Sequence, residues 1–218
     1  MAIFTIIAGK SGSGKSASME TINWDETFVI RPNRKPFPFS SKGIKAWDKE
    51  TKTGNFLYTD DYPMIQAVLA KLPEYGKKIV IIEDSTHILL KETMDTALEK
   101  GYDKFMHAAL NFYNMIKTAS ELPDNVRVYM ISHVDSDANG EEIIKITGGK
   151  FITEKIDVPS LATIALGAVK TKEGHMFRTQ SSGRDFYKSP KGLFDSEFIP
   201  NDLGAIDKAI VEYYGIGE

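Results

Sequence analysis

The sequence has 218 residues, of which 42% are hydrophobic and 26% are charged, a globular composition that excludes a disordered or fibrous chain. Lys and Arg total 27 against 30 for Asp and Glu, and this net charge of −3 excludes an overall basic surface but allows a local nucleic-acid groove. The absence of cysteine excludes disulfides, Cys-ligated zinc, iron–sulfur clusters and thiol catalysis. No apolar run approaches the ~18 residues of a membrane span and no signal-peptide layout is present, so we expect a cytoplasmic protein with no membrane partner.

Strands and helices are expected to alternate over the first part of the chain. Short apolar runs predict strands at residues 3–8, 27–30, 55–59, 78–82 and 126–131. The runs richest in β-branched residues suit strands that are buried on both faces of a parallel sheet. Helical periodicity and capping signals predict helices at residues 15–22, 63–72, 88–100 and 103–120. This alternation is typical of an α/β fold in which helices flank a mostly parallel central sheet.

The pattern changes after residue 135. Strand-like segments at residues 143–146, 163–169 and 175–179 come with hairpin signals at Asn139-Gly140 and Glu173-Gly174. Asn201 is expected to cap a final amphipathic helix. We therefore predict a single domain over residues 1–218, made of a core (1–135), an antiparallel, β-rich extension of the same sheet (136–200) and a C-terminal helix (201–218).

The segment after the first strand matches the pattern G-x-x-x-x-G-K-[ST] in full, as Gly9, Lys10, Ser11, Gly12, Ser13, Gly14, Lys15 and Ser16, followed by Ala17. Glycines permit a tight, partly left-handed turn whose backbone N–H groups approach phosphate oxygens, and the following helix presents its positive end to the same anion. Lys15 supplies a charge for the β- and γ-phosphates, and the Ser16 hydroxyl can ligate Mg²⁺. The motif predicts that residues 9–17 bind ATP with Mg²⁺ and that residues 1–135 form a nucleotide-binding core.

Polar residues follow the next two buried strands. Asp84, directly after the strand at 78–82, is predicted to hold the water shell of the Mg²⁺ ion. Glu83 is the candidate base that orients the attacking water, or else a carboxylate paired with a lysine on the other face, since strand side chains alternate unless the strand bends. His133 follows the strand at 126–131, where a parallel sheet forms its ligand crevice, and it either contacts the γ-phosphate or is structural.

A proline-rich loop after the second strand carries interleaved cations and aromatic rings: Arg31, Arg34, Lys35, Phe37 and Phe39. Such a set suits single-stranded DNA, because cations neutralise the backbone and rings stack on bases. The same residues could instead clamp the adenine or pack on the core, and the sequence leaves these three interpretations open.

Together these residues resemble the RecA/RadA/KaiC core, through a phosphate loop near the N-terminus, the Asp84-Ser85 pair after an apolar strand and a polar residue after the next strand. The carboxyl half is similar to phage-encoded RecA-like P-loop ATPases of the Sak type, which are linked to single-strand annealing and recombination. The motifs that carry this similarity are Phe177-Arg178-Thr179, Gly183-Arg184-Asp185, Lys188-Ser189-Pro190, Gly192-Leu193-Phe194 and Ile199-Pro200-Asn201-Asp202-Leu203.

The resemblance implies a RecA-like P-loop NTPase fold and ATP hydrolysis by a homo-oligomer. Its implied partner is single-stranded DNA, alone or with a single-strand-binding protein. It also implies that basic residues of one subunit complete the site of the next, and the candidates are Arg178, as a catalytic residue, with Arg184 and Lys188; the alternative is that they are ordinary solvated side chains.

Two features leave other functions open. RecA proteins carry a catalytic glutamate after their second core strand, where this chain has Arg31-Pro32-Asn33, so Glu83 is the nearby substitute. A small-molecule kinase that phosphorylates a nucleoside or nucleotide would use the same phosphate loop. A nucleotide-dependent interaction module that does not hydrolyse would result if Glu83 pointed away from the site.

Overall fold

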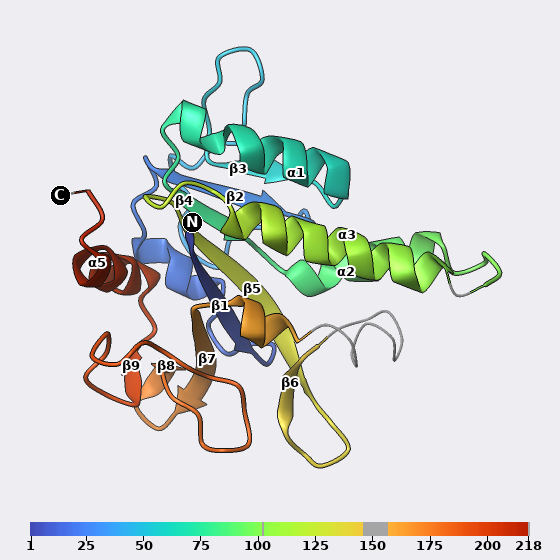
Figure 1. Ribbon diagram of the computed structural model, residues 1–218. Coiled ribbons are helices and arrows are strands. Elements are labelled where there is room, and N and C mark those ends of the chain that lie inside the picture. The colour runs from blue at the N-terminus through green and yellow to red at the C-terminus, as the bar shows by residue number, and fades with distance from the viewer. Residues whose placement is uncertain (102, 146–156, 218) are drawn as a thin grey trace.

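The computed structural model describes residues 1–101, 103–145 and 157–217. Within these residues a nine-stranded sheet crosses the molecule in the order β3-β2-β4-β5-β1-β7-β8-β9, with β6 attached to β5 (Figure 1). The strands are β1 (Ile3–Gly9), β2 (Thr27–Arg31), β3 (Phe56–Tyr58), β4 (Ile79–Ile82), β5 (Arg127–Ser136), β6 (Glu142–Ile144), β7 (Ile164–Thr171), β8 (Gly174–Arg178) and β9 (Phe198–Pro200). Neighbours from β3 to β7 are parallel, and only β6, β8 and β9 pair antiparallel. The predicted α/β class with a mostly parallel central sheet is confirmed.

Helices flank the sheet (Figure 1). The elements are the α-helices α1 (Tyr62–Lys71), α2 (Ser85–Asp95), α3 (Asp103–Ser120) and α5 (Leu203–Tyr214), and the 3₁₀ helices η1 (Ala17–Thr21), η2 (Leu72–Tyr75) and η3 (Val158–Leu161). Helices α1, α2 and α3 pack together on one face, and α5 packs with η1 on the other. In the described parts of the chain, none of the helices combines the length and the apolar character that crossing a membrane requires.

The central strands are largely apolar because both of their faces are buried. In β4, Val80 and Ile82 join the core beneath α1, α2 and α3, whereas Ile79 and Ile81 join the core beneath η1 and α5. Consecutive strand side chains point to opposite faces, so a continuous apolar run is what two cores require. Strands are present at all five positions predicted for residues 1–135, although β3, at the edge of the sheet, is only half-buried.

The helix expected at residues 15–22 is only the five-residue 3₁₀ helix η1. The Ser18 hydroxyl bonds to the local backbone, because Ser18 Oγ donates to the Lys15 carbonyl at 2.7 Å. Such local side-chain bonds compete with a regular α-helix. The chain becomes extended at Ile22, whose buried side chain packs in the core with α5.

The extension after residue 135 also departs from the prediction. β7 pairs parallel with β1, so antiparallel pairing in this part of the sheet begins only at β8. The reason is burial, since the first five residues of β7 are covered on both faces like those of a central parallel strand. The strand expected at 143–146 is Glu142–Ile144, and residue 146 lies outside the described residues. β9 was not expected, because its three residues are too few to show a period.

Two helix ends differ as well. Helix α2 begins at Ser85, immediately after the β4 turn, rather than near residue 88. Helix α5 is capped by Asp202, whose side chain accepts from the backbone N–H of Ala205, rather than by Asn201. Asp202 Oδ1 also accepts from Thr21 Oγ1, and this second bond ties the start of α5 to η1.

A buried ion pair attaches α5 to the middle of the sheet. Arg127 on β5 donates through Nε and Nη2 to the two carboxylate oxygens of Asp207, at 2.9 and 2.8 Å. Tyr129 Oη donates to the same carboxylate at 2.6 Å, and burial together with this negative charge raises the pKa of Tyr129, which keeps the phenol a donor. All three side chains are buried, so each polar group depends on the others for compensation.

Replacing Asp207 by alanine is expected to lower the free energy of unfolding by about 3–5 kcal/mol, because Arg127 would keep its buried charge without a partner. Urea denaturation measures the change. The matched control is Glu121→Ala, which removes an exposed carboxylate 3.8 Å from Lys117 and should cost less than about 1 kcal/mol. Equal losses in the two variants would contradict the role given to Asp207.

Candidate functional site

The phosphate loop leaves β1 at the edge of the sheet where the parallel strands end. Gly12 and Gly14 have φ angles of 75° and 97°, so the left-handed conformation expected from the motif is present. Gly9 is needed for a different reason, because a Cβ there would lie 2.4 Å from the carbonyl oxygen of Ala168 on β7. The short η1 provides a much smaller dipole than the helix predicted from the sequence, so any anion held at this loop would depend mainly on the loop N–H groups and Lys15.

Lys15 lies buried along the phosphate loop. Its Nζ donates to the carbonyl oxygens of Gly9 and Lys10, at 2.7 and 2.9 Å. Burial lowers the pKa of Lys15 to about 8, although the negative charge of Asp84 acts in the opposite direction. The ammonium group is therefore charged at neutral pH but loses its proton within a range that binding experiments can reach.

The chain turns sharply where β4 ends. Asp84 adopts a left-handed conformation, with φ 56° and ψ 45°, which is uncommon for a residue other than glycine. Because the strand stops at Ile82, the strict alternation of side chains stops there too, and both Glu83 and Asp84 line one cavity. The bend that the sequence analysis required for Glu83 to reach the site is thus present.

An arginine, rather than the lysine considered from the sequence, balances the charge of Glu83. Ile30 and Ile82 are paired in parallel register on β2 and β4, so the residues that follow them lie side by side. Arg31 Nε donates to Glu83 Oε2, and these side chains are only 3% and 10% exposed. The Arg31 guanidinium also lies 3.9 Å from the centre of the Phe37 ring, which fixes it from the other side.

Three side chains converge on the Asp84 carboxylate. Asn33 Nδ2 donates to Asp84 Oδ2 at 2.9 Å, while His87 Nδ1 and His133 Nε2 lie 2.9 and 3.2 Å from Asp84 Oδ1. Burial raises the pKa of Asp84, but the polar contacts and positive charge of His133 and His87 together outweigh burial and hold this pKa at about 2. Asp84 is therefore ionised throughout the physiological range and available to a cation.

His133 lies beside the start of the phosphate loop. Strand β5 continues to Ser136, beyond the end expected at residue 131, and the parallel register pairs His133 with Gly9. The backbone N–H of His133 donates to Thr86 Oγ1 at 3.3 Å, which connects the strand to the first turn of α2. The placement of His133 at the crevice edge of the sheet agrees with the expectation from its position after the third buried strand.

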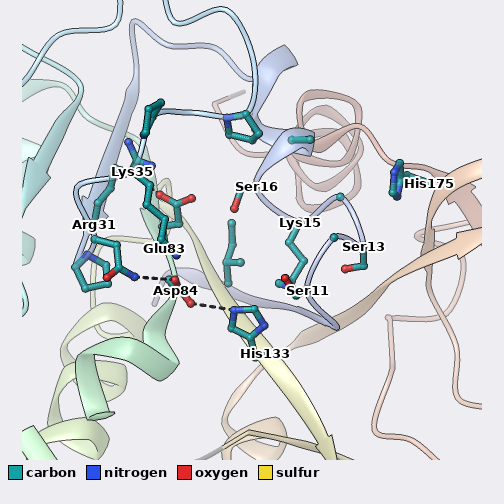
Figure 2. A pocket seen from close by; sticks show the side chains of 18 residues that line it. Ser11, Ser13, Lys15, Ser16, Arg31, Lys35, Glu83, Asp84, His133 and His175 are labelled. Carbon is teal, nitrogen blue, oxygen red and sulfur yellow. Dashed lines mark hydrogen bonds and ion pairs between the residues drawn. The ribbon is translucent and has the colours of Figure 1, made fainter. Parts of the chain in front are cut away.

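The converging residues enclose a cavity of about 430 Å³, a size that suits a small-molecule ligand. In Figure 2, Lys15 and Ser16 lie across the cavity from Glu83 and Asp84, with His133 beside the carboxylate. The lining residues are Ser11, Gly12, Ser13, Gly14, Lys15, Ser16, Ala17, Arg31, Pro32, Asn33, Lys35, Pro36, Pro38, Glu83, Asp84, Ile131, His133 and His175. Most of the predicted phosphate, metal and catalytic residues therefore meet at one site.

The residues present fit a Mg²⁺ ion that would accompany a nucleotide. Ser16 and Asp84, predicted from the sequence to serve the ion, both line the cavity, and they offer the hydroxyl and carboxylate oxygens that Mg²⁺ prefers. Asn33 fixes the second oxygen of Asp84 and so limits the rotation of the carboxylate.

The basic loop after β2 packs largely on the protein itself. Arg31 and Phe37 are 3% and 9% exposed, and Phe39 is half-buried with its ring 5.2 Å from that of Phe37. Because they are buried, Arg31 and Phe37 have no surface for a DNA strand. Of the three interpretations left open by the sequence, packing on the core therefore describes Arg31, Phe37 and Phe39. Arg34 and Lys35 are exposed, and Lys35 reaches the rim of the cavity.

The basic residues proposed to act on a neighbouring subunit lie outside this cavity. Arg178 contacts Asp185 and Glu197 through its two terminal nitrogens, so its guanidinium is already neutralised within its own chain. Arg184 and Lys188 are exposed, and the Lys188 backbone pairs with Ala165 on β7. Their action across a subunit boundary stays a prediction.

The sequence analysis missed three residues of the site: Asn33, His87 and His175. His87 becomes visible only when α2 is taken to begin at Ser85, because it then lies three residues, close to one helical turn, after Asp84. Asn33 depends on the path of an irregular loop. His175 on β8 borders the cavity because its ring packs beside Gly14, where a Cβ would lie 3.1 Å from the imidazole.

No protein-family model matches this chain, and a search of curated proteins found no match. The class of the protein therefore follows from fold and site. It is an α/β protein with a mostly parallel sheet, compatible with a P-loop or Rossmann-like fold, and a phosphate-loop motif borders its cavity.

Binding of a nucleoside triphosphate is expected to weaken several-fold between pH 7.5 and pH 9. The pKa of about 8 means that Lys15 loses most of its charge over this interval, and with it the attraction for phosphate. Fluorescent-nucleotide titration measures the affinity. The Lys15→Ala variant should bind weakly with a flat profile, and a wild-type affinity that does not change would contradict the role of Lys15.

Proposed function

We propose that this chain is a Mg²⁺-dependent nucleoside triphosphatase with ATP as its substrate. The observation that carries the proposal is the meeting of a complete phosphate loop with Glu83, Asp84 and His133 on one cavity. A glycine-rich turn that matched the motif by chance would have no reason to face two carboxylates and an imidazole from two other strand ends.

Each residue has a distinct task in this reaction. The N–H groups of residues 12–16 would hold the phosphates, Lys15 would leave its carbonyl partners to neutralise the β- and γ-phosphates, and Ser16 and Asp84 would hold the Mg²⁺ ion. The bound ion supplies neutralisation of charge on the transferred phosphoryl group. Lys15 and the ion thus act on the charge that develops during the reaction.

Glu83 is the proposed base that orients the attacking water. Arg31 holds one of its oxygens, which leaves Glu83 Oε1 to accept from a water molecule in the cavity. His133, beside Gly9, would contact the γ-phosphate and sense its presence. In this arrangement Arg31 is a positioning residue, because it acts through Glu83.

We further propose that the ATPase is RecA-like and acts as a homo-oligomer on single-stranded DNA in recombination or replication. Support comes from the resemblance of the carboxyl motifs to phage ATPases of the Sak type. Exposed Lys35, which lines the cavity, and its exposed neighbour in sequence Arg34 support it too, because a strand held at Lys35 would be next to the nucleotide. The trans-acting role of Arg178, Arg184 and Lys188 belongs to this part of the proposal.

Measuring ATP turnover with and without single-stranded DNA tests both parts. We expect Mg²⁺-dependent release of phosphate that Lys15→Ala abolishes and single-stranded DNA increases. Turnover that DNA leaves unchanged would contradict the DNA part alone. Phosphorylation of an added nucleoside, with no phosphate released, would show a kinase and contradict the hydrolase itself.

Replacing Glu83 by glutamine is expected to slow ATP turnover at least ~100-fold while leaving ATP affinity within a few-fold, because the amide can still accept from Arg31 but cannot take a proton. The control is Glu74→Gln, which changes an exposed glutamate of η2 outside the cavity. Turnover by Glu83→Gln at the wild-type rate would remove Glu83 from the mechanism.

A further inference from the structure

A second set of ligand atoms lies at the edge of the cavity. Asp84 Oδ1, His87 Nδ1 and His133 Nε2 lie within 4.8 Å of one another, and the two nitrogens are 2.9 and 3.2 Å from the carboxylate oxygen. A tetrahedral zinc ion with bonds of about 2.0–2.1 Å separates its ligand atoms by roughly 3.3 Å. The oxygen–nitrogen distances are thus already close to those of a coordination shell.

The fold brings these three atoms together from different elements. Asp84 belongs to the left-handed turn after β4, His87 to the first turn of α2, and His133 to β5, which is the neighbour of β4 in the sheet. Asp84 is the N-cap residue of α2, yet its side chain makes no capping bond and points to the imidazoles instead. An aspartate at this position ordinarily caps its helix, so the observed direction serves some other interaction.

The hydrogen bonds around the three residues are incomplete. Asp84 Oδ1 and His87 Nδ1 are shielded from solvent, and neither makes a hydrogen bond of good geometry within the described residues despite their closeness. Asn33 meanwhile holds the other carboxylate oxygen in place. Two shielded polar atoms that lie 2.9 Å apart without a well-formed hydrogen bond, beside a carboxylate that Asn33 holds in place, are what a cation site requires.

We propose that Asp84, His87 and His133 form a binding site for a divalent transition-metal ion of the Zn²⁺ or Co²⁺ type. Two imidazole nitrogens and one carboxylate oxygen favour such an ion over Mg²⁺ or Ca²⁺, which take oxygen ligands. Three protein ligands leave further coordination positions for water or for a ligand in the cavity that Asp84 and His133 line. The site goes beyond the proposed nucleotide hydrolysis, and because it shares Asp84 and His133 with that reaction, it is assigned to the chain without bound nucleotide.

The test uses the untagged full-length chain without nucleotide. Calorimetric titration with Zn²⁺ and visible absorption with Co²⁺ should show one ion per chain. His87→Ala and His133→Ala should each weaken binding at least tenfold, since even loss of a residue that supports a metal ligand typically costs 10–100-fold. The matched control is His107→Ala, which removes an exposed histidine of α3 and should leave the affinity unchanged.

A further variant keeps the outcome interpretable. Asn33→Ala leaves all three ligands in place and should weaken binding by a smaller factor. Circular dichroism checks that each variant is folded. Absence of stoichiometric binding, or equal affinity in wild type, His87→Ala and His133→Ala, would overturn the proposal and leave the three residues as an ion-pair cluster.

Discussion

The left-handed turn at Asp84 is the constraint on which the geometry of the site depends. A residue other than glycine in this conformation costs about 1–3 kcal/mol, so the surrounding structure must hold it there. Asn33 from one side and the two imidazoles from the other do so, through contacts with the Asp84 carboxylate. Were the strand to continue straight, side-chain alternation would direct Glu83 and Asp84 to opposite faces of the sheet, and one of them would leave the cavity.

The geometry of the site also depends on the buried ion pair of Arg31 and Glu83. Removing either partner would leave an uncompensated buried charge, at a cost of about 3–5 kcal/mol, so the two positions are tied to each other through the register of β2 and β4. The aromatic residues near Arg31, Phe37 above all, belong to the same arrangement because they pack on its guanidinium. A loop whose composition suits a DNA strand is therefore used mainly to hold the proposed base.

A feature of this protein could be predicted from the sequence when the residues that determine it are close together in the chain. Local patterns were sufficient for the apolar strands and for the left-handed glycines of the phosphate loop. They were also sufficient for Asp84 and His133, because each of these follows closely on an apolar run of the sequence. The pairing of Arg31 with Glu83 depends on the register between two strands 52 residues apart in sequence, which composition does not encode. His87 was missed because the start of α2 was placed three residues too late. The short length of η1 was missed because a local hydroxyl bond to the backbone prevailed over helix propensity.

The carboxyl part of the chain completes the phosphate loop as well as extending the sheet. Ala168 on β7 lies against Gly9, and Asn201 and His175 lie against Gly14, so two glycines of the motif are needed partly because this region packs on them. Thr21 at the end of η1 donates to Asp202 and accepts from the backbone N–H of Gly204, which joins the loop to the cap of α5. These contacts compensate for the missing α-helix after the loop: the helix that would ordinarily support its backbone is replaced by neighbours more than 150 residues away. Any change that loosens α5 from the sheet should therefore reach the phosphate site.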